Sequence, residues 1–297
     1  MAGLNLEGVY VPNVTPFDAN GEIQYEALAE LIEYWIGAGV SGVVANASTG
    51  ESPYLNRKEL IEVLTFVIDQ VDGRVQVIAG TGAMATRETI EMTCEAKNAG
   101  AAAVLIATPY FFRPTEEELY RHYAAVLSAV DISAILYNVP KFTGYSIAPK
   151  TIARISEDCS GLVGVKDSSG SPGNMAEIIR LCGDRIACLS GAADMFLPAI
   201  SLGGSGAVLA IANVVPGTCV ELYQAFKRGD VPLASKRQRT ASHVNNVLVA
   251  SFPQVAAIKS ALNRMGYKAG FPRQPLLPLS EEQEKAATEA LKNTKLY

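Results

Sequence analysis

Short apolar stretches alternate with longer amphipathic segments along roughly the first three quarters of the chain. Short β-branched runs predict buried strands, and apolar residues at three- and four-residue spacing predict helices. The predicted strands are Gly8–Asn13, Gly42–Ala45, Val75–Ala79, Ala103–Ile106, Ala134–Tyr137, Leu162–Lys166, Ile186–Leu189 and Gly206–Leu209. The predicted helices include Tyr25–Ile36, Arg57–Val71, Arg87–Asn98, Glu116–Val130 and Pro172–Leu181.

The residues at the predicted helix ends support this division. Asn56 and Thr115 precede helices as N-caps, and Gly39 and Gly100 follow helices. Strands that alternate with helices form a parallel sheet, and eight of them close a (β/α)8 barrel. We therefore expect an α/β fold of the TIM barrel type, with an open doubly wound sheet as the alternative.

The strand pattern ends near Val231, and the rest of the chain predicts three helices: Leu233–Val249, Pro253–Met265 and Ser280–Leu296. We therefore expect a catalytic barrel over residues 1–228 and a three-helix C-terminal extension over residues 229–297.

Composition narrows the possible partners. The 297 residues include 25 basic and 30 acidic side chains, a net charge of −5 that argues against a nucleic-acid surface. Residues 1–7 lack a signal-peptide pattern, and no apolar stretch approaches the ~20 residues that span a bilayer. Five scattered cysteines and two histidines predict no metal site. We expect a soluble cytoplasmic protein that binds neither nucleic acid nor membrane.

Polar residues at the carboxyl ends of the predicted strands mark the expected site, because barrel enzymes place their chemistry there. Lys166 ends an apolar strand, so its amine is carried into the barrel mouth. Burial favours the neutral amine, which attacks a ketone to form a Schiff base. The alternative is a structural lysine paired with Asp167.

Three further strand ends carry candidate residues. Tyr137 could act as a general acid and base, or could be a core aromatic. Ser48, Thr49 and Gly50 could hold a carboxylate in a turn, or form an ordinary connection. Gly191 follows the seventh strand.

Together these motifs resemble the dihydrodipicolinate synthase / N-acetylneuraminate lyase family of pyruvate-dependent class I aldolases. The similarity runs in order over nearly the whole chain. The matching motifs are Ser48-Thr49-Gly50-Glu51-Ser52, Gly80-Thr81-Gly82, Thr108-Pro109-Tyr110, Tyr137-Asn138-Val139-Pro140, Gly164-Val165-Lys166-Asp167-Ser168-Ser169 and Ala212-Asn213-Val214.

The resemblance implies a lyase that needs no cofactor beyond the covalent imine between pyruvate and Lys166. Tyr137 would be the proton shuttle and Ser48 would relay protons. Thr49 and Gly50 would bind the pyruvate carboxylate, and the Val208 backbone would contact the substrate. The family is usually a homotetramer, a dimer of dimers.

The chain departs from the family where the second substrate binds. Phe111 replaces a tyrosine that reaches into the neighbouring subunit's proton relay. Phe142 replaces an arginine that grips the carboxylate of aspartate semialdehyde, and Lys141 cannot offer the same bidentate contact. Ala192 and Ala193 replace acidic residues, so a pocket lined by them and by the two phenylalanines would be more apolar.

These departures favour a 4-hydroxy-2-oxo acid or 2-keto-3-deoxy acid aldolase, a carbon–carbon or carbon–oxygen lyase acting on a 2-oxo acid and an aldehyde. A 4-hydroxy-tetrahydrodipicolinate synthase, which joins pyruvate and aspartate semialdehyde in lysine biosynthesis, is the first alternative. A phosphate- or metal-dependent barrel enzyme using the loop 203–206, and a non-catalytic ligand-binding member of the family, are alternatives of other classes.

Overall fold

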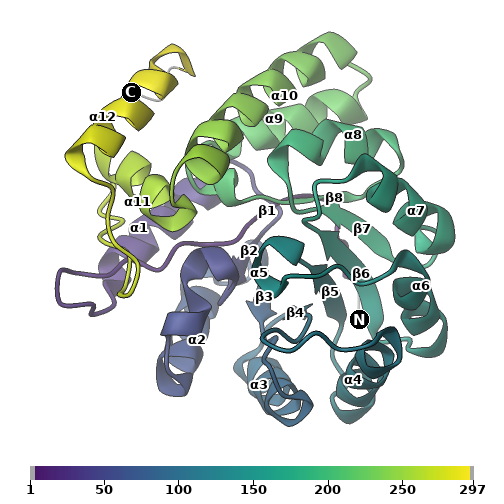
Figure 1. Cartoon of the computed structure of the whole chain (residues 1–297). Coiled ribbons are helices and arrows are strands. Elements are labelled where there is room, and N and C mark those ends of the chain that lie inside the picture. Colours follow the sequence, from purple (N-terminus) through teal and green to yellow (C-terminus); the bar gives the residue numbers. More distant parts are fainter. Residues whose placement is uncertain (1–3, 295–297) are drawn as a thin grey trace.

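The computed structural model describes residues 4–294. Eight parallel strands pair in chain order and the last pairs with the first, so the sheet closes into a barrel (Figure 1). The strands are β1 Gly8–Val11, β2 Gly42–Ala45, β3 Gln76–Gly80, β4 Ala103–Ala107, β5 Ala134–Asn138, β6 Leu162–Asp167, β7 Ala187–Ser190 and β8 Gly206–Val208. The predicted (β/α)8 barrel is confirmed.

Helices surround the barrel and also form the C-terminal extension. They are α1 Tyr25–Gly37, α2 Arg57–Val71, α3 Thr86–Ala99, α4 Glu116–Ala129, α5 Pro140–Thr143, α6 Pro149–Asp158, α7 Pro172–Cys182, α8 Phe196–Ser201, α9 Pro216–Lys227, α10 Val231–Asn245, α11 Gln254–Arg264 and α12 Glu281–Leu291. The sequence analysis did not specify α5, α6, α8 or α9.

The predicted helix starts at Asn56 and Thr115 are confirmed as full capping boxes. Each side chain accepts the N–H of the residue three positions on, Glu59 or Glu118, and that glutamate accepts the cap's own N–H. These reciprocal bonds satisfy backbone donors that a helix start leaves unpaired. They fix where α2 and α4 begin.

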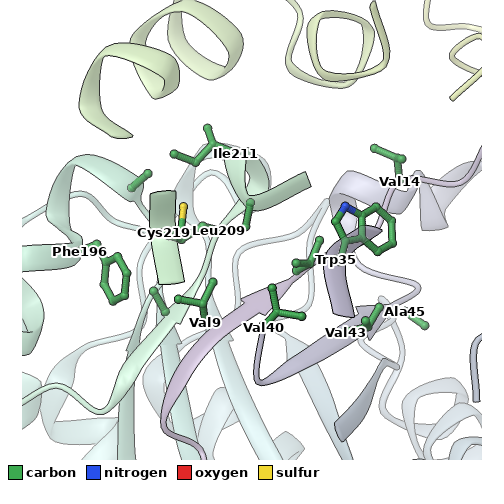
Figure 2. Close-up of a cluster of buried hydrophobic side chains, with 14 of the residues drawn as sticks. Val9, Val14, Trp35, Val40, Val43, Ala45, Phe196, Leu209, Ile211 and Cys219 are labelled. Atoms are coloured by element: carbon green, nitrogen blue, oxygen red, sulfur yellow. The ribbon is translucent and has the colours of Figure 1, made fainter. Parts of the chain in front are cut away.

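Buried apolar side chains form two layers. One fills the inside of the barrel and includes Tyr10, Ile135 and Val208. The other lies between the strands and the helices. Figure 2 shows a part of it around Trp35, whose indole N–H donates to the Asn213 carbonyl at 3.1 Å. Because successive strand residues point to opposite faces, each strand contributes to both layers.

The extension lies to one side of the barrel, in yellow-green to yellow in Figure 1. α10 continues into a π-helical turn, Asn246–Ser251, so the helix predicted over Leu233–Val249 consists of two segments. The last predicted helix ends earlier, at Leu291, and its predicted final residues, 295–296, fall outside the described part of the chain. Within the described residues, no helix has the length and apolar character needed to span a membrane.

Candidate active site

Lys166 and Tyr137 are direct neighbours on adjacent strands. Tyr137 on β5 is in register with Lys166 on β6, so both side chains point into the barrel. They are 3% and 6% exposed, and the Lys166 Nζ lies 4.0 Å from the centre of the tyrosine ring. The strand register alone therefore brings together an amine and a phenol.

Asp167 forms no ion pair with Lys166, so the alternative of a structural lysine paired with Asp167 is wrong. It lies on the opposite face of β6, where its carboxylate accepts from the Asn138 amide at 2.6 Å and from the Ser169 hydroxyl at 2.7 Å. None of the ion pairs in residues 4–294 includes Lys166. The strand alternation separates the two charged groups and leaves the amine facing the barrel interior.

The surroundings of the Tyr137 hydroxyl favour loss of its proton. Burial raises the pKa of the phenol, but the charge of Lys166 and hydrogen bonds with Ser48, Ser168 and Lys166 lower it by more. The net pKa of Tyr137 is therefore below its usual value, despite a fully buried position. A phenol with a lowered pKa can both take up and release a proton during a reaction.

Ser168 is a site residue that the sequence analysis did not single out. Its hydroxyl helps to lower the pKa of the Tyr137 phenol, and a methyl group added at Gly191 would lie 1.9 Å from the Ser168 Oγ and 3.1 Å from the Lys166 Cε. Gly191 is therefore required because Ser168 and Lys166 occupy the space beside it. The signal was present in the sequence, since residues two apart at a strand end share a face.

The residues Ser48–Gly50 form one turn of 3-10 helix after β2. The Thr15 hydroxyl donates to the Gly50 carbonyl at 2.7 Å, and a side chain at Gly50 would lie 2.8 Å from the Asn13 carbonyl oxygen. The Gly50 N–H donates to the Ala47 carbonyl at 3.0 Å. Gly50 thus allows close packing, while Ser48 presents its hydroxyl to Tyr137.

A cavity of about 1270 Å³ opens above these residues. Tyr137, Ser48 and Phe142 line it. Lys166 is not among the lining residues, but its Nζ lies 4.0 Å from the ring centre of Tyr137, which is. The extension forms much of the wall through residues 249–250, 252–256 and 275–278. The sequence analysis placed the extension on the barrel but did not predict that it would enclose the site.

The outer part of the cavity is mostly apolar. Phe142 and Leu277 border it and are 51% and 71% exposed. Lys141 is the one cationic side chain among its described lining residues, and its Nζ donates to the Val249 carbonyl at 3.3 Å. Gln254 of the extension reaches the Thr49 hydroxyl at 3.5 Å.

Four other candidate residues do not line the cavity. Val208 is buried in the inner barrel layer with Tyr137. Phe111 is 84% exposed, has a left-handed backbone with φ of 78° and stacks edge-on with Phe112, and it does not line the cavity. Ala192 and Ala193 are also absent from the lining. Of the two phenylalanines and two alanines expected to line the pocket, only Phe142 does so.

The glycine-rich loop considered as a phosphate site precedes β8, at the amino end of the barrel strands. Side chains at Gly204 and Gly206 would lie 2.8 Å from the Ala199 carbonyl oxygen and 2.2 Å from that of Gly8. Close backbone packing accounts for these glycines. Across residues 4–294, no group of three or more His, Cys, Asp or Glu side chains is placed to hold a metal ion.

Comparison with known proteins extends this picture. Residues 5–294 match the model of the dihydrodipicolinate synthetase family. The chain is 39% identical over 290 residues to a 4-hydroxy-tetrahydrodipicolinate synthase of Geobacter sulfurreducens, covering 98% of this chain and 99% of that protein. It is also 39% identical to the enzyme of that name from Methanocaldococcus jannaschii, covering 97% and 98%.

Solved structures agree. The dihydrodipicolinate synthase of Aquifex aeolicus superposes with a TM-score of 0.93 at 34% identity, covering 98% of this chain and 99% of that one. The E. coli K12 prophage protein YagE, solved in complex with pyruvate, gives 0.95 at 31% identity, covering 99% and 100%. The resemblance in the motifs is thus confirmed: this chain belongs to the dihydrodipicolinate synthetase family, lyases that form a Schiff base between a lysine and pyruvate without a metal or an external cofactor.

Proposed function

We propose that Lys166 is the lysine that forms the imine, and that the chain joins bound pyruvate to an aldehyde or releases pyruvate from a larger 2-oxo acid. The observation that carries the proposal is the register of Tyr137 with Lys166 inside the barrel. The buried position keeps water from the amine, and the neighbouring phenol can deliver and remove protons.

Lys166 and Tyr137 would carry the reaction together. The neutral amine of Lys166 adds to the C2 carbonyl of pyruvate, and one of its protons moves to the oxygen. The resulting hydroxyl group takes a proton from Tyr137 and leaves as water, which gives the protonated imine. The Tyr137 phenolate removes a C3 proton to give the enamine. C3 then attacks the aldehyde carbon, and the new alkoxide takes that proton back from Tyr137. Water finally adds to C2 of the protonated imine and releases the product and the free amine, while the proton set free returns to Tyr137. Ser48 relays protons to Tyr137, while Thr49 and Gly50 hold the carboxylate.

For the acceptor, the best supported activity is that of a 4-hydroxy-tetrahydrodipicolinate synthase, the name of the full-length relatives at 38–39% identity. Lys141 in the cavity wall supports an acceptor with an anionic group. A 4-hydroxy-2-oxo acid or 2-keto-3-deoxy acid aldolase is the second candidate. Phe142, which offers no charge to a second carboxylate, favours it.

Borohydride reduction with pyruvate, followed by intact-mass measurement, tests the imine. We expect one covalent adduct in the wild-type protein and none in Lys166→Ala. An adduct that survives this substitution would overturn the assignment. Activity with aspartate semialdehyde, compared with cleavage of hydroxylated 2-oxo acids, then separates the two candidates.

We further propose that the enzyme works in the cytoplasm as a homotetramer, with residues 1–228 as the catalytic barrel and 229–297 as the extension. The exposed rings of Phe111 and Phe112, at 84% and 79%, support a subunit contact at this face. Sedimentation analysis of the wild-type protein and of Phe111→Ser tests the assembly.

A further inference from the structure

The C-terminal extension reaches the candidate site through a buried ion pair. The Nζ of Lys259, on α11, lies 2.5 Å from Oε1 of Glu51, and the two side chains are 1% and 0% exposed. The next most buried ion pair of the described residues, between Arg273 and Glu59, is 17% and 19% exposed. The Glu51–Lys259 pair is therefore a distinct feature of the interior.

The contacts of this pair tie two segments of the extension to Glu51 and to Phe17. The second oxygen of Glu51 accepts the backbone N–H of Arg273 at 2.8 Å. Lys259 also donates to the Phe271 carbonyl at 2.7 Å, and its ammonium lies 4.4 Å from the Phe17 ring centre. Although Glu51 borders the cavity, both of its oxygens are occupied by the extension.

Glu51 directly follows the turn that carries the candidate carboxylate site. Its backbone is left-handed, with φ of 61°, and its N–H donates to the Ser48 carbonyl at 3.2 Å. A side chain rarely adopts this conformation unless its surroundings hold it. The position of the Glu51 carboxylate therefore helps to set how Ser48 and Thr49 are presented.

Stability alone does not explain the pair. Burial lowers the pKa of Lys259 to about 8, although Glu51 acts in the opposite direction. Buried ion pairs often contribute no more to stability than well-packed apolar residues of similar volume. What charges add over apolar groups is a defined direction and distance of contact, which suits a role in geometry.

We infer that Glu51 and Lys259 are positioning residues that hold the Ser48–Gly50 turn in the geometry that binds the carboxylate of a 2-oxo acid. The inference rests on the proposed function of that turn. It makes the extension part of the substrate site, through α11 and the segment after it.

The test is the pyruvate concentration that gives half-maximal borohydride-trapped adduct in the full-length protein. We expect this concentration to rise at least tenfold in Glu51→Gln and in Lys259→Met, with the same maximal adduct. The matched control is Ser260→Ala, which removes the 3.0 Å hydrogen bond from the Ser260 hydroxyl of α11 to Glu284 of α12 and touches neither Glu51 nor Arg273. It should lower the thermal midpoint and leave the pyruvate concentration within twofold of wild type.

A double variant guards against misfolding of the single ones. Glu51→Gln with Lys259→Met leaves no unpaired buried charge, so it should recover stability while the pyruvate concentration stays at least fivefold raised. Values within twofold of wild type in the folded variants would overturn the inference alone. Absence of an adduct in the wild-type protein would overturn the proposed function, and this inference with it.

Discussion

Lys166 and Tyr137 stand on paired strands and are 3% and 6% exposed. Phe142 stands on the short helix α5 and Leu277 on the connection between α11 and α12, and these two side chains are 51% and 71% exposed. The first pair forms the inner half of the candidate site and the second pair borders the outer half. Strand register fixes the inner half, because neither strand can slip without moving the whole barrel.

The outer half has no such constraint. α5 and the segments from the extension meet there only through tertiary packing, and connections of this kind tolerate substitution. A family member can therefore carry Phe142 at this position while Lys166 and Tyr137 keep theirs. The comparison indicates that the first half-reaction and the choice of acceptor are separable in this fold.

Tyr137→Phe should have the largest effect on turnover. Removal of the phenolic hydroxyl should lower kcat by about 10²- to 10⁴-fold, the usual contribution of a general acid or base, with little change in pyruvate affinity. Steady-state rates and borohydride trapping measure the two quantities. Tyr123→Phe, which loses a buried hydroxyl in the outer layer, is the control. Equal losses of rate and affinity would mean that Tyr137 only packs.

Gly191→Ala should disturb the inner half indirectly. The new methyl group must displace Ser168, whose hydroxyl helps to lower the pKa of Tyr137, so we expect a roughly 10- to 100-fold lower kcat from the misplaced groups. The alkaline side of the rate profile should shift upward in pH, because the protonated phenol is the active form and the pKa of Tyr137 rises when Ser168 is displaced. Gly217→Ala, at an open position in α9, serves as the control. An unchanged pH dependence of the rate would mean that Ser168 does not affect proton transfer by Tyr137.

Lys141→Met should affect only the outer half. Loss of a partly solvated charge should raise KM for an anionic acceptor by about fivefold, equivalent to roughly 1 kcal/mol, and leave pyruvate trapping unchanged. Lys150→Met, which removes an exposed charge outside the cavity, is the matched control. A change in pyruvate trapping would contradict the separation of the two halves.

Substitution of His122 should have the smallest effect on rate, because this residue contributes to the stability of the barrel and not to either half of the site. His122 is 5% exposed, and burial lowers its pKa from 6.5 to about 4. Because the unfolded chain binds this proton more readily, the neutral histidine contributes stability that is complete above pH 6.5 and is lost as pH falls towards 4. The loss is at most about 3 kcal/mol.

Denaturant titrations between pH 7 and pH 4 measure this loss. His122→Gln should flatten the dependence, and His243→Gln, at an exposed histidine, should not. The rates at pH 7 should stay close to wild type in both variants. If the free energy of unfolding of His122→Gln falls with pH as steeply as that of the wild type, other groups cause the loss of stability in acid.

The hydrophobic pattern alone was enough to predict the barrel, since eight apolar runs separated by amphipathic segments leave few other arrangements. It also placed Lys166 and Tyr137 at strand ends, because the apolar run just before each residue is enough to predict the strand. The predicted bounds of β2 are confirmed, and those of the other strands differ from the observed ones by at most two residues, because the pairing of neighbouring strands decides where each one stops.

Contacts between distant parts of the chain were decided only by the tertiary structure. Nothing local in the sequence relates Glu51 to Lys259, which are 208 residues apart, or shows that Gln254 reaches Thr49. The exposure of the Phe111 ring and the position of Lys141 in the cavity wall likewise depend on how the segments between the strands pack. The sequence by itself determined which reactive side chains lie on the strands, because the periodicity that predicts a strand involves only neighbouring residues. Only the tertiary structure decided which segments enclose the site, because that depends on packing between distant parts of the chain.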